Sequence, residues 1–310
     1  MPDYEHLGKG VYHLDSHYTA AGVASLYAIV HNDEVAFIET GIAHSLPYVK
    51  RFLQDQGLSA EQVRYVIPTH VHLDHAGGAG VMMQAFPNAE LVIHPRGARH
   101  MIDPSRLIAG TIQVYGEKLF HEIYGDIPPI EENRVIVAEH EACIMLNDRE
   151  LLIVDTPGHA YHHFCIVDAF SQGIFTGDTF GLSYPDVLSH GKRFILPTTT
   201  PVHFNPQALH ASVDLLMSFK PERMYLTHFN VLPDPALLVD QYHNWIDKFV
   251  ELTEQIKPDD NSLIPAMIEK MGSLIAAEFA IQPEVLESKL AMDIKLNCQG
   301  LAYWYQHRNG

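Results

Sequence analysis

The chain contains, from residue 63 to residue 75, the stretch Val63-Arg64-Tyr65-Val66-Ile67-Pro68-Thr69-His70-Val71-His72-Leu73-Asp74-His75. Its first half is largely apolar and predicts a buried strand over residues 63–67. Three histidines and one aspartate follow within a few residues of the expected strand end. Imidazole and carboxylate groups are costly to bury unless they bind a positive charge, and together they suit zinc and iron-group ions. This stretch therefore predicts a metal site at the end of a strand.

The spacing of the polar residues indicates two metal ions. In an extended chain, residues two apart point to the same side, so His70 and His72 can reach one ion. Asp74 and His75 follow a change of direction, ahead of a helix predicted over residues 79–85, and can face a second ion. The competing interpretation is a histidine-rich surface turn, because the chain has 21 histidines. The preceding strand and the Asp-His ending favour the metal site.

Further ligands are expected at the ends of other strands. The apolar runs 151–154, 173–176 and 223–226 lead to His159, Asp178 and His228, respectively. Three strands that each deliver one potential ligand at an edge of a sheet are hard to explain by core packing alone. Strands also alternate with predicted helices along this part of the chain. The sequence thus predicts an α/β or α+β layered fold with ligands at strand ends.

The pattern His70-x-His72-x-Asp74-His75, followed by His159, Asp178 and His228, resembles the metallo-β-lactamase superfamily over residues 10–232. The resemblance implies an αββα sandwich. It also implies a first metal held by His70, His72 and His159, and a second held by Asp74, His75 and His228, with Asp178 bridging both. Zinc is the preferred metal by ligand type, and iron and manganese suit the same ligands.

Two positions distinguish branches of this superfamily. His72 replaces the Glu of the flavodiiron branch, and Asp178 replaces the Cys of the β-lactam-hydrolysing branch. The pattern is most similar to glyoxalase II-like thioesterases and lactonases. It implies a hydrolase that uses a metal-bridging hydroxide on an ester-type bond of a small molecule, with Asp74 and Asp178 as catalytic residues. The alternatives are an iron-dependent redox enzyme resembling persulfide dioxygenases and a non-catalytic binding protein.

Composition limits the partners. The 310 residues include 20 basic and 38 acidic side chains, a net charge of −18, which disfavours nucleic acid binding. No apolar run is long enough for a membrane span, and the N-terminus lacks a signal pattern. The cysteines Cys143, Cys165 and Cys298 lie in apolar stretches and are expected to be reduced core residues of a cytoplasmic protein. No Gly-x-Ser-x-Gly, His-Glu-x-x-His or phosphate-loop motif appears, and no organic cofactor is expected.

Two regions depart from the strand–helix alternation. Residues from about 95 to 132 predict short helices inserted in a catalytic domain of residues 1–232, where they are a candidate wall of the active-site pocket. Residues 233–310 predict a C-terminal helical region. The apolar face from Leu238 to Ile256 must pack on the catalytic domain, on later helices or on a second copy of the chain. We expect it beside the metal face, and a homodimer contact is the weaker alternative.

Substrate contacts are expected close to the ligands. Tyr161 and His162 follow His159, Phe229 follows His228, and Phe204 lies in the loop region beyond Asp178. Ordinary loop packing is the alternative for each. His163 is expected to support a ligand and Cys165 to be a core residue.

Overall fold

The computed structural model describes residues 4–188, 193–199 and 202–308. Within these residues the strands form a seven-stranded sheet, in the order β1 to β7, and a six-stranded sheet, in the order β13-β12-β11-β10-β9-β8. The chain divides into two compact units. The first comprises Met1–Asp155, His162–Gly177 and Arg223–Val231, and the second comprises Thr156–Tyr161, Asp178–Glu222 and Leu232–Gly310. The separation of a catalytic domain 1–232 from a helical region 233–310 stays a prediction.

The first sheet combines antiparallel and parallel pairing. It contains β1 (Tyr4–Gly8), β2 (Val11–Asp15), β3 (Ser25–His31), β4 (Glu34–Ile38), β5 (Val63–Ile67), β6 (Glu90–Ile93) and β7 (Val135–Val137). Strands β1 to β4 pair antiparallel, and β4 to β7 pair parallel. Between β3 and β4, Asn32 and Asp33 have φ values of 46° and 64°. Positive φ at both positions suits a two-residue hairpin turn.

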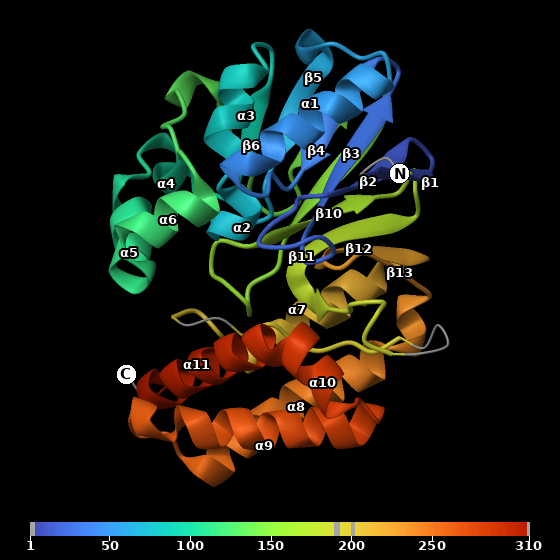
Figure 1. The fold of residues 1–310 in the computed structure, drawn as a ribbon. Coiled ribbons are helices and arrows are strands. Elements are labelled where there is room, and N and C mark those ends of the chain that lie inside the picture. Colours follow the sequence, from blue (N-terminus) through green and yellow to red (C-terminus); the bar gives the residue numbers. More distant parts are fainter. Residues whose placement is uncertain (1–3, 189–192, 200–201, 309–310) are drawn as a thin grey trace. The chain divides into compact units, whose positions relative to one another are not determined.

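Helices cover the outer face of this sheet. They are α1 (Leu46–Asp55), α3 (Ala79–Ala85) and α4 (Ala98–Ile102). Phe52 of α1 and Met82 of α3 pack with Phe37 and Leu91 of the sheet in one buried cluster. Figure 1 shows α1 and α3 lying across the strands. Each such side chain contributes about 1.5–3 kcal/mol when removed from water, so this face holds the helices in place.

The second sheet packs on the inner face of the first. It contains β8 (Cys143–Leu146), β9 (Arg149–Asp155), β10 (Phe164–Asp168), β11 (Gly173–Leu182), β12 (Arg223–His228) and β13 (Val231–Pro233). Within the first unit, Tyr27 and Ile67 of the first sheet share a buried cluster with Ile153, Ile166 and Phe175 of the second. The predicted mixed α/β fold, with two sheets and a C-terminal helical region, is confirmed.

The prediction that all three cysteines lie in the core is wrong for Cys143. Its strand, β8, is at the edge of the second sheet. Burial alternates along β8, so Cys143 and Met145 are exposed while Ile144 and Leu146 are buried. Four apolar residues in a row could not reveal that only one face of the strand is covered. Cys165 and Cys298 are buried, as predicted.

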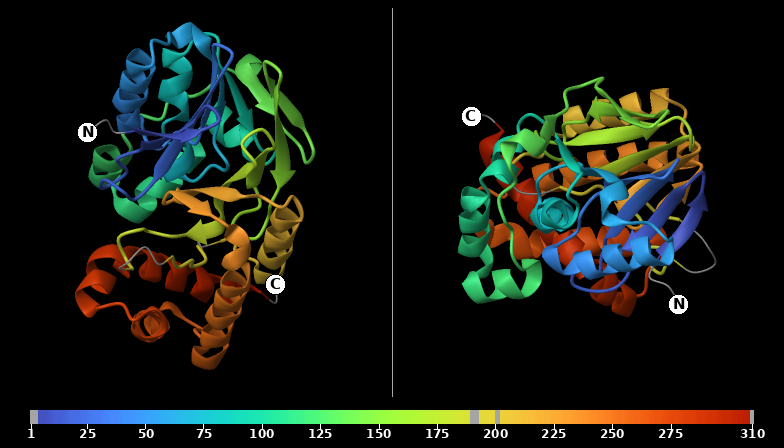
Figure 2. Two further views of the ribbon diagram at one scale, coloured as in Figure 1. Left: turned by 90° about the vertical axis from the view of Figure 1, so that its right-hand side faces the viewer. Right: turned by 90° about the horizontal axis from the view of Figure 1, so that it is seen from above.

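The predicted insertion is helical. After α2 (Leu73–Ala76) and α3, it contains α4, α5 (Ser105–Tyr115) and α6 (Glu117–Tyr124). Helices α5 and α6 lie side by side, as Figure 2 shows. Phe120 and Tyr124 of α6 are buried in a cluster with Leu73. The insertion therefore packs its apolar side chains against the segment that carries the candidate ligands.

The C-terminal part of the second unit is a helical layer. The helices of this unit are α7 (Pro206–Ser218), α8 (Val239–Ile256), α9 (Ile264–Phe279), α10 (Pro283–Val285) and α11 (Ala291–His307). Elsewhere in the two units, short 3-10 helices are found at η1 (Ala43–Ser45), η2 (Ala60–Gln62), η3 (Glu132–Arg134), η4 (Pro235–Leu237) and η5 (Asn261–Leu263), and a π-helical turn at η6 (Leu286–Leu290). Among the described residues, none of the helices has the length and apolar character that a membrane span requires.

Later helices cover the apolar face of α8. The Trp245 ring of α8 stacks on Phe279 of α9, with centroids 5.5 Å apart. Cys298 of α11 lies against Met271 of α9, with a sulfur–sulfur distance of 3.7 Å. Figure 1 shows α8, α9 and α11 in orange to red. Of the three surfaces considered from the sequence, the later helices thus provide partners for α8. Its expected place beside the metal face and the homodimer stay predictions.

His13 makes the first unit sensitive to acid. It is 6% exposed on β2, and its Nε2 atom lies 3.0 Å from Ser25 Oγ. Burial lowers the pKa of His13 from 6.5 to about 4, against the smaller opposing charge of Asp15. In the unfolded chain this histidine is protonated below about pH 6.5, whereas in the folded chain it stays neutral until about pH 4. The free energy of unfolding therefore has its full value above pH 6.5 and decreases as the pH falls towards 4. The free energy of unfolding of the wild type should decrease over this pH range by on the order of 3 kcal/mol more than that of His13→Gln.

Urea unfolding at about pH 7, 5.5 and 4.5 measures this difference. The matched control is His307→Gln, because His307 is exposed on α11. Its free energy of unfolding should run parallel to that of the wild type at every pH. Parallel curves for His13→Gln as well would contradict the prediction.

Candidate metal centre

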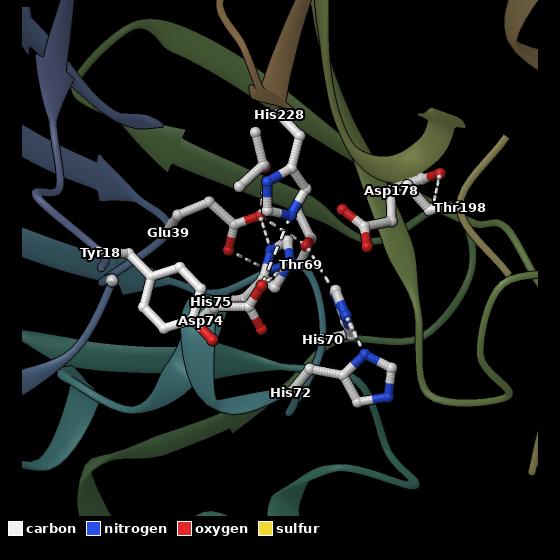
Figure 3. Close-up of polar contacts among 12 residues, drawn as sticks. Tyr18, Glu39, Thr69, His70, His72, Asp74, His75, Asp178, Thr198 and His228 are labelled. Atoms are coloured by element: carbon white, nitrogen blue, oxygen red, sulfur yellow. Dashed lines mark hydrogen bonds and ion pairs between the residues drawn. The ribbon is translucent and has the colours of Figure 1, made fainter. Parts of the chain in front are cut away.

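Three donor side chains converge in the first unit. Asp74 and His75 lie in α2, which follows a bent segment ending at His72, and His228 is the last residue of β12. One ligand atom of each lies within 4.8 Å of the others. Asp74 Oδ2 is 3.6 Å from His75 Nε2 and 3.4 Å from His228 Nε2. Figure 3 shows the two imidazoles turned towards this carboxylate.

The outer nitrogen of each ring fixes its tautomer. His75 Nδ1 lies 2.9 Å from Glu39 Oε1, and His228 Nδ1 lies 3.0 Å from the Val23 carbonyl oxygen. Both partners are acceptors, so each Nδ1–H donates and each neutral ring presents its Nε2 lone pair to Asp74. Two lone pairs and a carboxylate repel one another unless a cation lies among them. The donor set therefore fits a divalent metal ion.

Asp74 is suited to remain ionised in this cluster. Burial by itself raises the pKa of the carboxyl group, but positive charge on the adjacent His75 and His228 and on the more distant His72 outweighs that effect. A cation held between neutral rings would supply the same positive charge. The pKa of Asp74 is therefore held below its usual range. A carboxylate rather than a carboxylic acid faces the imidazoles, as metal binding requires.

A second pair of imidazoles lies beside this cluster in the first unit. His70 Nε2 and His72 Nδ1 are 2.8 Å apart. His70 Nδ1 lies 3.1 Å from Thr69 Oγ1, and that hydroxyl donates to Glu39 Oε1 at 2.6 Å. The Thr69 oxygen therefore accepts the Nδ1–H of His70 and leaves the Nε2 lone pair towards His72. These two nitrogens form a second potential pair of metal ligands.

Glu39 was not singled out from the sequence, yet it organises this region. It is 1% exposed. Its Oε1 accepts from Thr69, His75 and Thr227, the last at 3.0 Å, and its Oε2 accepts from the Thr69 backbone N–H at 3.0 Å. The available signal was the one used for the ligands, a polar residue directly after an apolar strand. Carboxylates that hold a ligating histidine in this way tune both its orientation and its basicity.

The second unit contributes a similar pair. His159 Nε2 lies 3.3 Å from Asp178 Oδ2, and His159 Nδ1 donates to the Thr198 carbonyl oxygen at 3.1 Å. Thr198 Oγ1 in turn donates to the Asp178 backbone oxygen at 3.1 Å, as drawn in Figure 3. Again the outer nitrogen is anchored and the inner lone pair faces a carboxylate. His159 and Asp178 thus show the same donor chemistry as the first unit.

The sequence suggested that Asp178 follows the end of a strand, but the structure places it elsewhere. Strand β11 continues to Leu182, so Asp178 lies within it. The preceding Gly177 has a φ of 49°. A Cβ atom there would lie 2.4 Å from Thr69 Oγ1 and 2.5 Å from His163 Nε2. Only glycine allows this kink and close approach, which changes the direction of the strand immediately before Asp178.

The expected substrate residues have varied surroundings. Tyr161 is 42% exposed, and its ring lies 4.8 Å from that of His203. The His162 ring lies 6.0 Å from that of His70. Two phenylalanines are mostly buried against aromatic neighbours: Phe204 has its ring 6.1 Å from Trp304, and Phe229 has its ring 4.7 Å from His13. A role in lining the substrate site stays a prediction for all four.

Two further residues were interpreted as non-ligands. The His163 ring lies 4.9 Å from that of His70 and is fully buried. Cys165 Sγ donates to the Thr176 carbonyl oxygen at 3.4 Å. His163 therefore packs on a candidate ligand, and Cys165 lies in the sheet core.

The two sheets and the histidines and aspartates that lie on and beside their strands define an α/β sandwich with a candidate metal centre. The model of the metallo-beta-lactamase superfamily matches residues 20–228, and the chain belongs to this superfamily. The predicted family is confirmed, while the glyoxalase II-like branch stays a prediction.

Several proteins are similar to this chain in sequence or in fold. The metallo-beta-lactamase fold-containing protein ST1585 of Sulfurisphaera tokodaii is 25% identical over 231 residues, covering 73% of this chain and 80% of that protein. Its crystal structure gives a TM-score of 0.61 at 19% identity, covering 90% of this chain and 93% of that one. The crystal structure of the metallo-beta-lactamase family protein TTHA1429 of Thermus thermophilus gives a TM-score of 0.65 at 16% identity, covering 98% of this chain and 95% of that one. The human acyl-coenzyme A thioesterase MBLAC2 is 23% identical over 188 residues, or 56% of this chain and 65% of that protein.

The contacts of Glu39 predict that Glu39→Gln weakens metal binding. An amide cannot accept all of these hydrogen bonds, and it lacks the charge that makes His75 a better ligand. The affinity for zinc should fall by about 10–100-fold, measured by competition with a chelating dye. Glu34→Gln is the matched control, because Glu34 begins the same strand and accepts from the Asn147 backbone N–H instead. Equal zinc affinities for Glu39→Gln and the control would contradict the assigned role.

Proposed function

We propose that the protein is a dinuclear metal-dependent hydrolase that cleaves an ester-type bond in a small molecule. In this proposal His70, His72 and His159 bind one ion, Asp74, His75 and His228 bind the other, and Asp178 bridges them. The observation that carries it is the common arrangement of the imidazoles, in which the outer nitrogens of His75, His228 and His159 are anchored on oxygens. Their inner nitrogens face carboxylates.

The chain's own groups prepare the reaction. When bound, divalent ions at these ligands supply a water-derived nucleophile at neutral pH and polarise a carbonyl oxygen. Asp74 would contribute an ionised carboxylate, because positive charge on the neighbouring histidines, or on an ion that they hold, lowers its pKa. Glu39 keeps His75 in the tautomer that offers Nε2. Zinc is the metal we expect, with iron or manganese as substitutes.

The apolar cluster beside the ligands supports an acyl thioester as substrate. Leu73 lies between His72 and Asp74 in the sequence and packs with Phe120, Tyr124 and Ile127. Half-buried side chains of α5 and α6 continue this cluster, namely Leu107, Ile108, Ile112 and Ile123. An apolar acyl chain would find favourable contacts there. The likeness to an acyl-coenzyme A thioesterase supports the same substrate class.

Two other classes of function remain as alternatives to test. An iron-dependent redox enzyme requires one redox-active iron and a thiol substrate. A binding protein requires neither turnover nor a specific metal count. Activity on thioesters, lactones and phosphodiesters, with and without a chelator, separates these classes. Chelator-sensitive thioester hydrolysis supports the proposal, and the absence of any hydrolysis would refute it.

The proposed bridge makes Asp178 the most sensitive ligand. Asp178→Ala should lower metal content from about two ions per chain and reduce turnover by at least about 100-fold, because both ions lose a ligand. Elemental analysis and thioesterase assays measure the two effects. Cys165→Ser, in the same sheet, should leave both unchanged. Full metal content in the Asp178 variant would show that another group bridges the ions.

The apolar cluster predicts a preference for longer acyl chains. Ile112→Ser should lower kcat/KM for a long-chain thioester by about 10-fold, since a polar side chain costs roughly 1–2 kcal/mol of apolar contact. The same variant should leave an acetyl thioester nearly unaffected. Leu119→Ser is the control, because Leu119 is 43% exposed on α6, outside the cluster. An equal loss for both chain lengths would contradict the assignment.

A further inference from the structure

A group of four polar side chains connects two helices of the second unit. His210 and Asp214 lie one turn apart on α7, and His243 and Asp247 lie one turn apart on α8. His210 Nε2 is 3.1 Å from Asp247 Oδ1, and His243 Nε2 is 3.2 Å from Asp214 Oδ1. Each histidine is thus bound through its Nε2 atom to the aspartate of the opposite helix.

The two imidazoles then face each other through their remaining nitrogens. His210 Nδ1 and His243 Nδ1 are 2.6 Å apart. The ring planes differ by 10° and the centroids are 4.9 Å apart. This nitrogen separation is too short for rings stacked face to face, so the rings lie edge to edge in nearly one plane. Both Nδ1 atoms therefore point at the same position between the helices.

The aspartates determine what that position can hold. A carboxylate accepts a hydrogen, so Asp247 and Asp214 favour the tautomers in which both Nε2 atoms carry the proton. Both Nδ1 lone pairs are then directed at one another, which is repulsive unless a proton or a metal ion lies between them. An imidazole that ligates a metal through one nitrogen commonly donates its other N–H to a carboxylate. Here that arrangement occurs twice, symmetrically about one point.

We propose that His210 and His243 bind a divalent transition metal ion through their Nδ1 atoms and so link α7 to α8. Zinc and copper suit two neutral imidazoles, and water completes the coordination. Two nitrogens on one tetrahedral zinc lie about 3.3 Å apart, so the two Nδ1 atoms, 2.6 Å apart, need to separate by about 0.7 Å and the rings need to turn towards one ion. The side chains of His210 and His243 are 28% and 22% exposed, so the ion can enter from solvent and the rings have room to move.

Charge also favours the site. Asp214 and Asp247 place two negative charges beside the nitrogens, and the whole chain carries a net charge of −18. Both aspartates attract a divalent cation more strongly than a single proton. This site is independent of the proposed hydrolytic reaction, because it uses none of the candidate catalytic ligands.

Calorimetric titration of the zinc-loaded protein with Zn²⁺ tests the proposal. The wild type should bind one zinc ion more than the double variant His210→Ala/His243→Ala, while the thioesterase activity of the two proteins stays equal. His307→Ala, which removes an exposed histidine of α11, should keep the additional ion. No additional zinc in the wild type, or the same additional zinc in the double variant, would overturn the proposal.

The aspartates provide a test that does not disturb the helices. Asp214→Asn and Asp247→Asn replace side chains that are 74% and 64% exposed. Each substitution should lower the affinity for the additional zinc ion by about 10-fold or more, because an amide orients the imidazole less well than a carboxylate. In Cu²⁺-loaded wild type, electron paramagnetic resonance should show two coupled nitrogens at this site that the double variant lacks. Unchanged zinc affinity in both aspartate variants would count against the arrangement.

Discussion

The buried carboxylate of Glu39 is the interaction on which the first unit's donor cluster depends. A fully desolvated carboxylate is costly unless its oxygens are satisfied. Glu39 meets this condition by accepting hydrogen bonds from Thr69 and His75, which follow β5, and from Thr227, which lies in β12. The same contacts hold the ends of β4, β5 and β12 together. Glu39 therefore contributes both to holding these strand ends together and to orienting His75.

The sheets hold the candidate ligands in place, and departures from regular strand structure determine where their side chains point. His70 and His72 follow β5 in a short bent segment, and α2 then begins, so Asp74 and His75 point elsewhere. In β11 the kink at Gly177 has the same consequence for Asp178. Candidate ligands that lie on α2, β11 and β12 are held more precisely than side chains on loops would be. An apolar strand followed by a cluster of polar residues therefore predicts a metal site.

The sequence predicted best where a pattern was local. Strand 63–67 and helix 79–85 have the predicted bounds, because apolar spacing and flanking turn residues define each one. The short strands β1, β7 and β8 were not predicted, since they depend on pairing with distant partners. Cys143 was misplaced for the same reason. Glu39 was missed because its role consists of contacts with residues about 30 to 190 positions away.

The imidazole's two unlike nitrogens explain both groups of histidines. In each group an oxygen fixes the proton on one nitrogen and so directs the other lone pair. In the first unit the anchors for His75 and His228 are the buried Glu39 and a backbone carbonyl. On α7 and α8 the anchors are exposed aspartates, which water competes for and salt screens. Buried anchors lose less orientation, so at limiting metal the candidate ligands of the first unit should fill before the α7–α8 pair. With metal at both proposed sites, the burial of the anchors alone would separate a tightly held ion from an exchangeable one.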